Sequence, residues 1–273
     1  MRGYEMRIDS LCFDTTKTYE DIRVFGFGHE SCIQKFFFLT EKKNLMDFLL
    51  EQRRMGKEIR IVTPFVPERH LKRMKEVIIQ LLKMECFYDS TIIVNDYGLM
   101  NFLHRTDRKI KICLGRCLLF SFSYAPWGEK MYEDESPDIR KVVSQISFYD
   151  QEKMEFFRNL HVEEIEVNCS LGIMESLKKI QDENFRVNIH LTDFLYGAQR
   201  SCYIRRQAHD GSCNGLECET PMEIRAEALW SDGEYYDIPA ETEFPDLLYI
   251  RGNKIYGDAR EMSYDWCNGL III

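Results

Sequence analysis

The sequence of 273 residues predicts an α/β protein, a TIM-like (β/α) barrel, complete or incomplete, with a small C-terminal β-rich segment. Short apolar stretches alternate with amphipathic ones at roughly thirty residues per unit, which is typical of parallel βαβ repeats. Six such units precede residue 201. No GxGxxG motif follows the first strand, so a barrel is favoured over an open dinucleotide-binding sheet.

Glycine and proline mark the boundaries of the elements in the first two units. Residues 22–28 (IRVFGFG) form a buried strand that ends in glycine, and residues 44–52 form an amphipathic helix that Gly56 stops. Residues 58–64 (EIRIVTP) form the second strand. Pro67 then opens a helix whose apolar residues recur at spacings of three and four.

The later units follow the same rhythm. Residues 91–95 (TIIVN) form a strand, Asp96 caps a helix over 97–104, and residues 109–120 form a fourth strand. The remaining predicted elements are helices at 151–159 and 174–180 and strands at 163–168 and 185–191.

Two stretches depart from this pattern. The stretch 121–147 carries Trp127 and an acidic run, and is either a lid over the site or an inserted segment. From residue 223 the chain is β-rich, with a hairpin turning at 252–253. We therefore expect a barrel domain over 1–222, which includes a cysteine loop at 201–219, and a C-terminal segment over 223–273 packed on the barrel.

Composition narrows the class of protein. A net charge of -9 does not favour nucleic acid as a partner, since phosphate binding requires clustered Lys and Arg. No apolar run has the length of a signal peptide or a membrane span, so we expect a cytoplasmic protein. Its 10 cysteines are then unlike a disulfide framework, which favours a metal site.

The loop 201–219 (SCYIRRQAHDGSCNGLECE) is the best metal-binding candidate. Its cysteines Cys202, Cys213 and Cys218 are separated by ten and then four residues, with glycines that allow tight turns between them. Three thiolates suit a soft metal centre, either zinc or an iron–sulfur cluster.

A fourth ligand is needed to complete such a site. Cys32 follows the strand 22–28, and the carboxyl ends of barrel strands share one face with the segment after the strand 185–191. His209 lies inside the loop and is the alternative ligand. Cys113 and Cys117 resemble the start of a radical SAM motif but lack its third cysteine, so we interpret them as core residues of one strand.

Histidines are the candidate acids and bases. His29 lies three residues before Cys32 with Glu30 beside it, and His190 lies on a predicted strand. Neither an HExxH motif nor a P-loop occurs.

Several motifs together resemble the collagenase-like peptidase family U-32, and most of all its short, barrel-only branch. That branch includes the smaller subunit of the pair needed for oxygen-independent ubiquinone hydroxylation. The matching stretches are GFGHESC, GKEIRIVTPF, TIIVNDYGLMNFL, YGAQRSCYIRR with its two downstream cysteines, and WCNGL. The chain departs from the larger members of the family in lacking their Glu-x-Phe-x-x-Gly-x-x-Cys signature.

The resemblance implies a 4Fe–4S cluster on Cys32, Cys202, Cys213 and Cys218. It also implies a role in oxygen-independent hydroxylation or a related modification of a small aromatic or RNA-borne ring, with a second family member as heterodimer partner.

Three residues, His29, Glu30 and Arg205, are our candidates for positioning the substrate. Two alternatives remain. The loop could bind zinc structurally in a non-catalytic scaffold, or the protein could be a U-32 peptidase, which the missing nucleophile–base arrangement disfavours.

Overall fold

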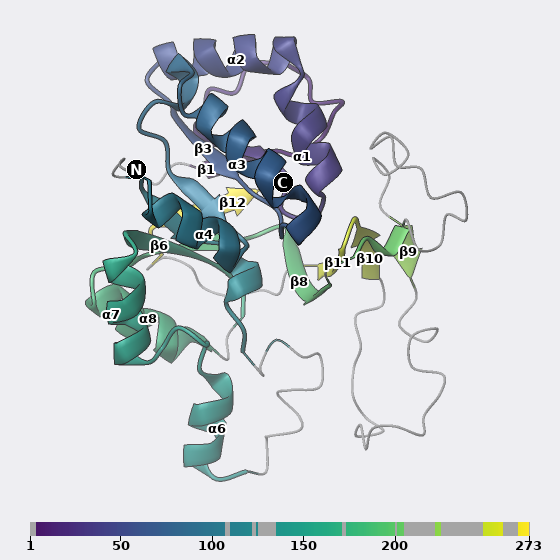
Figure 1. Cartoon of the computed structure of the whole chain (residues 1–273). Coiled ribbons are helices and arrows are strands. Elements are labelled where there is room, and N and C mark those ends of the chain that lie inside the picture. The colour runs from purple at the N-terminus through teal and green to yellow at the C-terminus, as the bar shows by residue number, and fades with distance from the viewer. Residues whose placement is uncertain are drawn as a thin grey trace.

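The computed structural model describes residues 4–106, 110–121, 124, 135–170, 173–199, 201–204, 222–224, 248–258 and 267–272. Within these residues, eight strands form a closed barrel in the order β1-β12-β7-β6-β5-β4-β3-β2, and every pairing is parallel (Figure 1). The barrel strands are β1 (Tyr4–Ile8), β2 (Ile22–Gly28), β3 (Glu58–Val62), β4 (Ile92–Val94), β5 (Ile112–Leu114), β6 (Val162–Asn168), β7 (Arg186–His190) and β12 (Gly269–Ile272). The TIM-like barrel is therefore confirmed, and it is closed rather than incomplete.

Helices cover the outside of the barrel. They are α1 (Ile33–Thr40), α2 (Lys43–Arg54), α3 (Glu68–Leu81), α4 (Tyr97–His104), α7 (Gln151–Asn159) and α8 (Met174–Asp182). The structure also describes the exposed helix α6 (Pro137–Ser144) and the 3-10 turns η1 (Glu85–Phe87) and η2 (Arg116–Leu118). The apolar face of each strand, such as Phe25 and Phe27 of β2, packs with the buried helix residues in one hydrophobic core. Among the described helices, none combines the length and apolar character that a membrane crossing requires.

The first and last barrel strands were not predicted from the sequence. β1 and β12 pair with each other and close the barrel. β1 (YEMRI) alternates charged and apolar residues, and β12 (GLII) is only four residues long. Neither is a buried apolar run followed by a helix, which was the pattern that identified the other strands.

The predicted strand 109–120 is wrong in its length. β5 ends at Leu114, and the 3-10 turn η2 begins at Arg116. The amide of Gly115 still donates to the carbonyl of Val94, but the next contact is from the Cys117 amide to the side chain of Asn95. The side chain of Asn95 thus accepts the hydrogen bond that a neighbouring strand would otherwise accept, and the chain turns away from the sheet here.

A second, antiparallel sheet leaves the barrel where β7 ends. In the part of the chain that the structure describes, it contains β8 (Asp193–Ala198), β9 (Met222–Ile224), β10 (Leu248–Arg251) and β11 (Lys254–Asp258), in the order β8-β11-β10-β9. The β10–β11 hairpin turns at 252–253, as predicted. Figure 1 shows this sheet extending to one side of the barrel from β8.

The segment 121–147 is described in part. It contains the exposed helix α6, none of whose residues is buried. Trp127 lies outside the described residues.

Candidate functional site

Polar side chains gather at the carboxyl ends of the barrel strands, where the second sheet begins. Glu30 follows β2, Arg116 follows β5, and Asn168 ends β6. His190 ends β7, and Asp193 starts β8. Because parallel barrel strands place these ends on one face, residues far apart in the sequence meet there.

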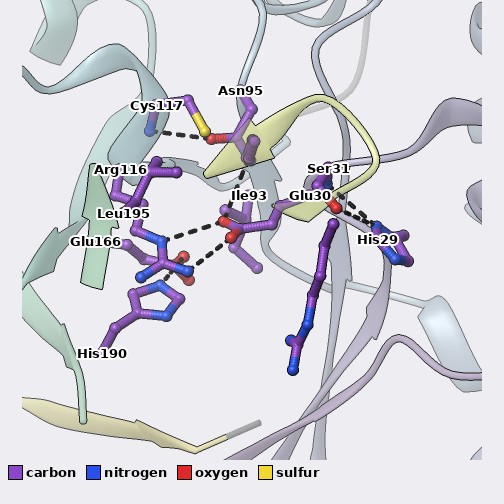
Figure 2. Close-up of polar contacts among 12 residues, drawn as sticks. His29, Glu30, Ser31, Ile93, Asn95, Arg116, Cys117, Glu166, His190 and Leu195 are labelled. Carbon is purple, nitrogen blue, oxygen red and sulfur yellow. Dashed lines mark hydrogen bonds and ion pairs between the residues drawn. The ribbon is translucent and has the colours of Figure 1, made fainter. Parts of the chain in front are cut away.

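Arg116 is the centre of this group, and its side chain is fully buried. Its Nη2 donates to Oε1 of Glu30 at 2.7 Å, while Nη1 lies 2.9 Å from Oδ1 of Asp193. Nη1 also donates to the Asp193 carbonyl at 3.1 Å and to Oδ1 of Asn168 at 3.3 Å. Figure 2 shows Arg116 and Glu30 pointing toward each other. A buried charge is tolerated only with such partners, so this arginine fixes three strand ends together.

The second sheet adds two more groups to the same cluster. The Tyr256 hydroxyl donates to Oε1 of Glu30 at 2.7 Å, and Nζ of the buried Lys254 lies 3.6 Å from Oε2. Burial alone would raise the pKa of Glu30, but the charges of Arg116 and Lys254 outweigh it and hold the pKa well below its ordinary value. Glu30 is therefore an ionised anchor between barrel and sheet.

The interior of the barrel is charged. Arg7 of β1 pairs with Glu166 of β6, and Arg60 of β3 lies 2.9 Å from Glu164 of β6 and 3.4 Å from Glu5 of β1. In the barrel order none of these strand pairs is adjacent, so the side chains cross the interior. Most such barrels are filled by branched apolar residues, and here ion pairs replace much of that packing.

Glycines make room for these long side chains. A Cβ at Gly26 would lie 2.7 Å from Oε1 of Glu5 and 2.8 Å from Cδ of Arg7, and one at Gly269 would lie 2.4 Å from Oδ1 of Asn188. Cys113 contributes to a small apolar cluster inside the barrel, and burial raises its pKa well above the ordinary value. The core interpretation thus holds for Cys113, whereas Cys117 lies past the end of β5.

His190 and Glu166 form a buried pair below Arg116 (Figure 2). Nε2 of His190 lies 3.1 Å from Oε2 of Glu166, whose other oxygen pairs with Arg7. Burial would raise the pKa of Glu166, but Arg7 and His190 lower it to about 2. Burial, together with the charge of Arg116, lowers the pKa of His190. At neutral pH the pair is therefore a carboxylate and a neutral imidazole.

A small cavity opens beside this pair, with about 20 Å3 of space for a water-sized group. Arg7, His190, His29 and Ser31 line it, and the partly exposed Asp9 and Arg251 stand at its edge. Ser31 donates its amide to Nδ1 of His29 at 3.1 Å. Burial, reinforced by Lys35, lowers the pKa of His29 well below its ordinary value, so this imidazole is also neutral.

Two of the proposed metal ligands lie on the same face. Cys32 caps α1, and its sulfur accepts from the Lys35 amide at 3.5 Å. A Cβ built at Gly252 would lie 3.2 Å from Cβ of Cys32, and the carbonyl of Gly252 accepts from the Tyr203 amide at 2.8 Å. Cys202 directly precedes Tyr203. Gly252 of the β10–β11 turn therefore contacts both the segment that carries Cys32 and the segment that carries Cys202.

The other candidates lie outside the described residues. They are Arg205, His209, Cys213 and Cys218. Among the described residues, no three His, Cys, Asp or Glu side chains are grouped as a metal ligand set. Of the candidates for positioning substrate, His29 lines the cavity and Glu30 is engaged by Arg116 and Tyr256.

Sequence reasoning missed Arg116, Lys254, Tyr256 and the Arg7–Glu166 pair. The signal for the barrel interior was present, because strands such as EMRI and EEIEVN alternate acidic or basic residues with apolar ones. In a barrel whose outer face is covered by helices, the polar half of that alternation faces inward. Arg116 and Lys254 carry no such signal, since their burial depends on how the second sheet lies.

The chain matches no protein-family model, no curated protein and no solved structure.

Proposed function

We propose that this protein holds a 4Fe–4S cluster on Cys32, Cys202, Cys213 and Cys218 at the carboxyl end of the barrel. The observation that supports this is the turn at Gly252, which contacts the Cys32 segment and the Cys202 segment together. Cys213 and Cys218 follow Cys202 closely in the sequence. Thiolates are the usual ligands of such clusters.

The chemistry of Cys32 fits this role. Its sulfur caps the N-terminus of α1 and accepts a backbone N–H bond. A helix N-terminus stabilises negative charge on a thiolate, and N–H bonds to sulfur tune the reduction potential of a cluster. When bound, the cluster would supply one-electron chemistry beside the cavity that His29 and Ser31 line.

The resemblance to the U-32 family extends this proposal to an activity. We infer a role in oxygen-independent hydroxylation, or a related modification, of a small aromatic or RNA-borne ring, with a second family member as heterodimer partner. The described residues support it to this extent: the wall of a small cavity contains Ser31, which directly precedes Cys32, together with two neutral imidazoles and two arginines.

Anaerobic purification with iron and sulfide counts and a visible spectrum tests the cluster. We expect a brown protein with about four iron and four sulfide per chain. Cys213→Ala should abolish the cluster, while Cys12→Ala, at an exposed cysteine that is not one of the proposed ligands, should retain it.

The opposite results would be equally clear. Full iron and sulfide in Cys213→Ala would reject this ligand set. A colourless protein with one zinc would favour the structural zinc scaffold, since four-cysteine zinc sites are usually closed and add stability. Peptide cleavage that persists without all four cysteines would favour a U-32 peptidase.

A further inference from the structure

The wall of the cavity contains hydrogen-bonding atoms that no described residue satisfies. Nη2 of Arg7 faces Glu166 and lies 3.1 Å from Glu5, but its Nε and Nη1 have no hydrogen-bond partner within the described part of the chain. The same is true of Nδ1 of His190, which lies 3.9 Å from Oδ1 of Asp193. Both side chains are over nine-tenths buried and line the cavity. Buried polar atoms without partners are costly, so these atoms call for a water or a ligand group in the cavity.

The chemical character of each atom follows from its neighbours. Glu166 is ionised and can only accept, so the neutral His190 must carry its hydrogen on Nε2, which faces Glu166. Nδ1 then presents a lone pair. Arg7 presents only N–H donors. The cavity thus offers one hydrogen-bond acceptor, Nδ1 of His190, and the N–H donors of Arg7. The two oxygens of Glu166 hold these two side chains in place.

One kind of group satisfies both atoms at once. A hydroxyl oxygen can donate its hydrogen to Nδ1 of His190 and accept from Arg7. The space of about 20 Å3 holds one such oxygen, since a single water molecule requires about 10–15 Å3 of such space. The rest of the molecule would extend past Asp9 and Arg251, which are partly exposed.

We propose that this cavity binds the hydroxyl group of a small alcohol or phenol, with His190 as its proton acceptor and Arg7 stabilising its oxygen. For an acidic hydroxyl the O–H bond breaks, the electron pair stays on oxygen, and the proton forms an N–H bond at Nδ1. Glu166 holds the imidazole in place and stabilises the imidazolium, as carboxylates do for catalytic histidines.

The charges around His190 are compatible with this transfer. Burial and the charge of Arg116 oppose a second proton on the ring, whereas Glu166 and Glu30 favour it, so the transfer depends on Arg7 stabilising the oxyanion that forms. Of the charged groups that line the cavity, Arg7 and Arg251 favour an oxyanion over a neutral hydroxyl, whereas Asp9, 3.8 Å from Arg251, and Glu30 oppose it. The site uses residues of β1, β6 and β7 and does not depend on the cysteines.

Binding of 4-nitrophenol tests the proposal, because its anion is yellow and its neutral form is not. At a pH below the pKa of the probe, wild-type protein should produce the phenolate spectrum in a difference measurement against protein alone. 4-Nitroanisole, which lacks the hydroxyl, should not bind. His190→Gln should abolish the phenolate signal and weaken binding at least about tenfold, while His104→Gln, at an exposed histidine, should behave as wild type.

A second variant separates loss of the site from loss of the fold. Val62 lines the cavity and is buried, so Val62→Leu places an extra methylene in the space while leaving the His190–Glu166 pair intact. It should also weaken binding, with an unfolding midpoint close to that of wild type. No phenolate signal from wild type, or equal signals from wild type and a folded His190→Gln, would overturn the proposal. Because the probe needs no iron, failure here is distinct from failure of the cluster.

Discussion

Replacing Arg116 by methionine should be among the most destabilising single changes in this protein. The substitution keeps much of the side-chain volume but removes the guanidinium that lies 2.7 Å from Glu30 and 2.9 Å from the buried Asp193, and leaves Glu30 with Tyr256 and Lys254 alone. Breaking a buried ion pair from one side costs about 3–5 kcal/mol, because the remaining charge stays desolvated. For a chain of this size, a loss of about 3 kcal/mol lowers the melting temperature by roughly 6–12 °C.

Urea unfolding followed by circular dichroism measures this loss directly. Arg54→Met is the matched control, since Arg54 and Glu85 lie 3.4 Å apart with side chains 64% and 65% exposed. An exposed pair contributes little, so the control should stay within about 0.5 kcal/mol of wild type. If Arg116→Met loses no more stability than Arg54→Met, the cluster is not the junction between barrel and sheet that the structure indicates. If Arg116→Met does not fold, Arg116→Lys keeps the charge without the fork and gives a smaller loss to compare.

Two further predictions concern the turn and the barrel interior. Gly252→Ala should lower iron content as well as stability, because its φ is 60° and a Cβ would lie 2.3 Å from the Ser31 carbonyl. Gly56→Ala, with a φ of 84° but no atom within 4 Å, should lower stability alone, and equal iron loss in both would contradict this. Glu166 has its pKa lowered from 4.5 to about 2, which corresponds to about 3 kcal/mol present above pH 4.5 and lost as the pH falls toward 2. The stability gap between wild type and Glu166→Gln should therefore shrink in acid, and a gap independent of pH would refute this.

Much of the fold could be predicted because the outer face of the barrel is regular. Strands such as β2, β6 and β7 bury Ile, Val and Phe against helices whose apolar residues recur every three or four positions. This periodicity is local, so the sequence reveals it. β1 does not stand out because charged residues interrupt it, and β12 because it is only four residues long, and the two strands pair with each other to close the barrel.

The candidate site was less accessible from the sequence. The position of Cys32 after β2 follows from strand order, and its neighbour His29 was identified for the same reason. Arg116 and Lys254 look like ordinary surface residues in the sequence, yet both are fully buried. Their burial depends on contacts between β5, β8 and β11, which are separated by long stretches of chain, and such contacts leave no periodic pattern.

The charged interior and the second sheet together explain why the polar site lies where it does. In this barrel, charged contacts run from the interior to the carboxyl ends of the strands. Arg7 pairs with Glu166, Glu166 contacts His190, and Asp193 lies near both His190 and Arg116. Each of these buried charged groups needs polar partners. The groups at the carboxyl ends of the strands therefore require polar side chains from outside the barrel. Lys254 and Tyr256 of the second sheet supply them over Glu30. Arg7 and Nδ1 of His190 are among the atoms of this network that lack hydrogen-bond partners within the described residues, and a hydroxyl bound in the cavity would complete them.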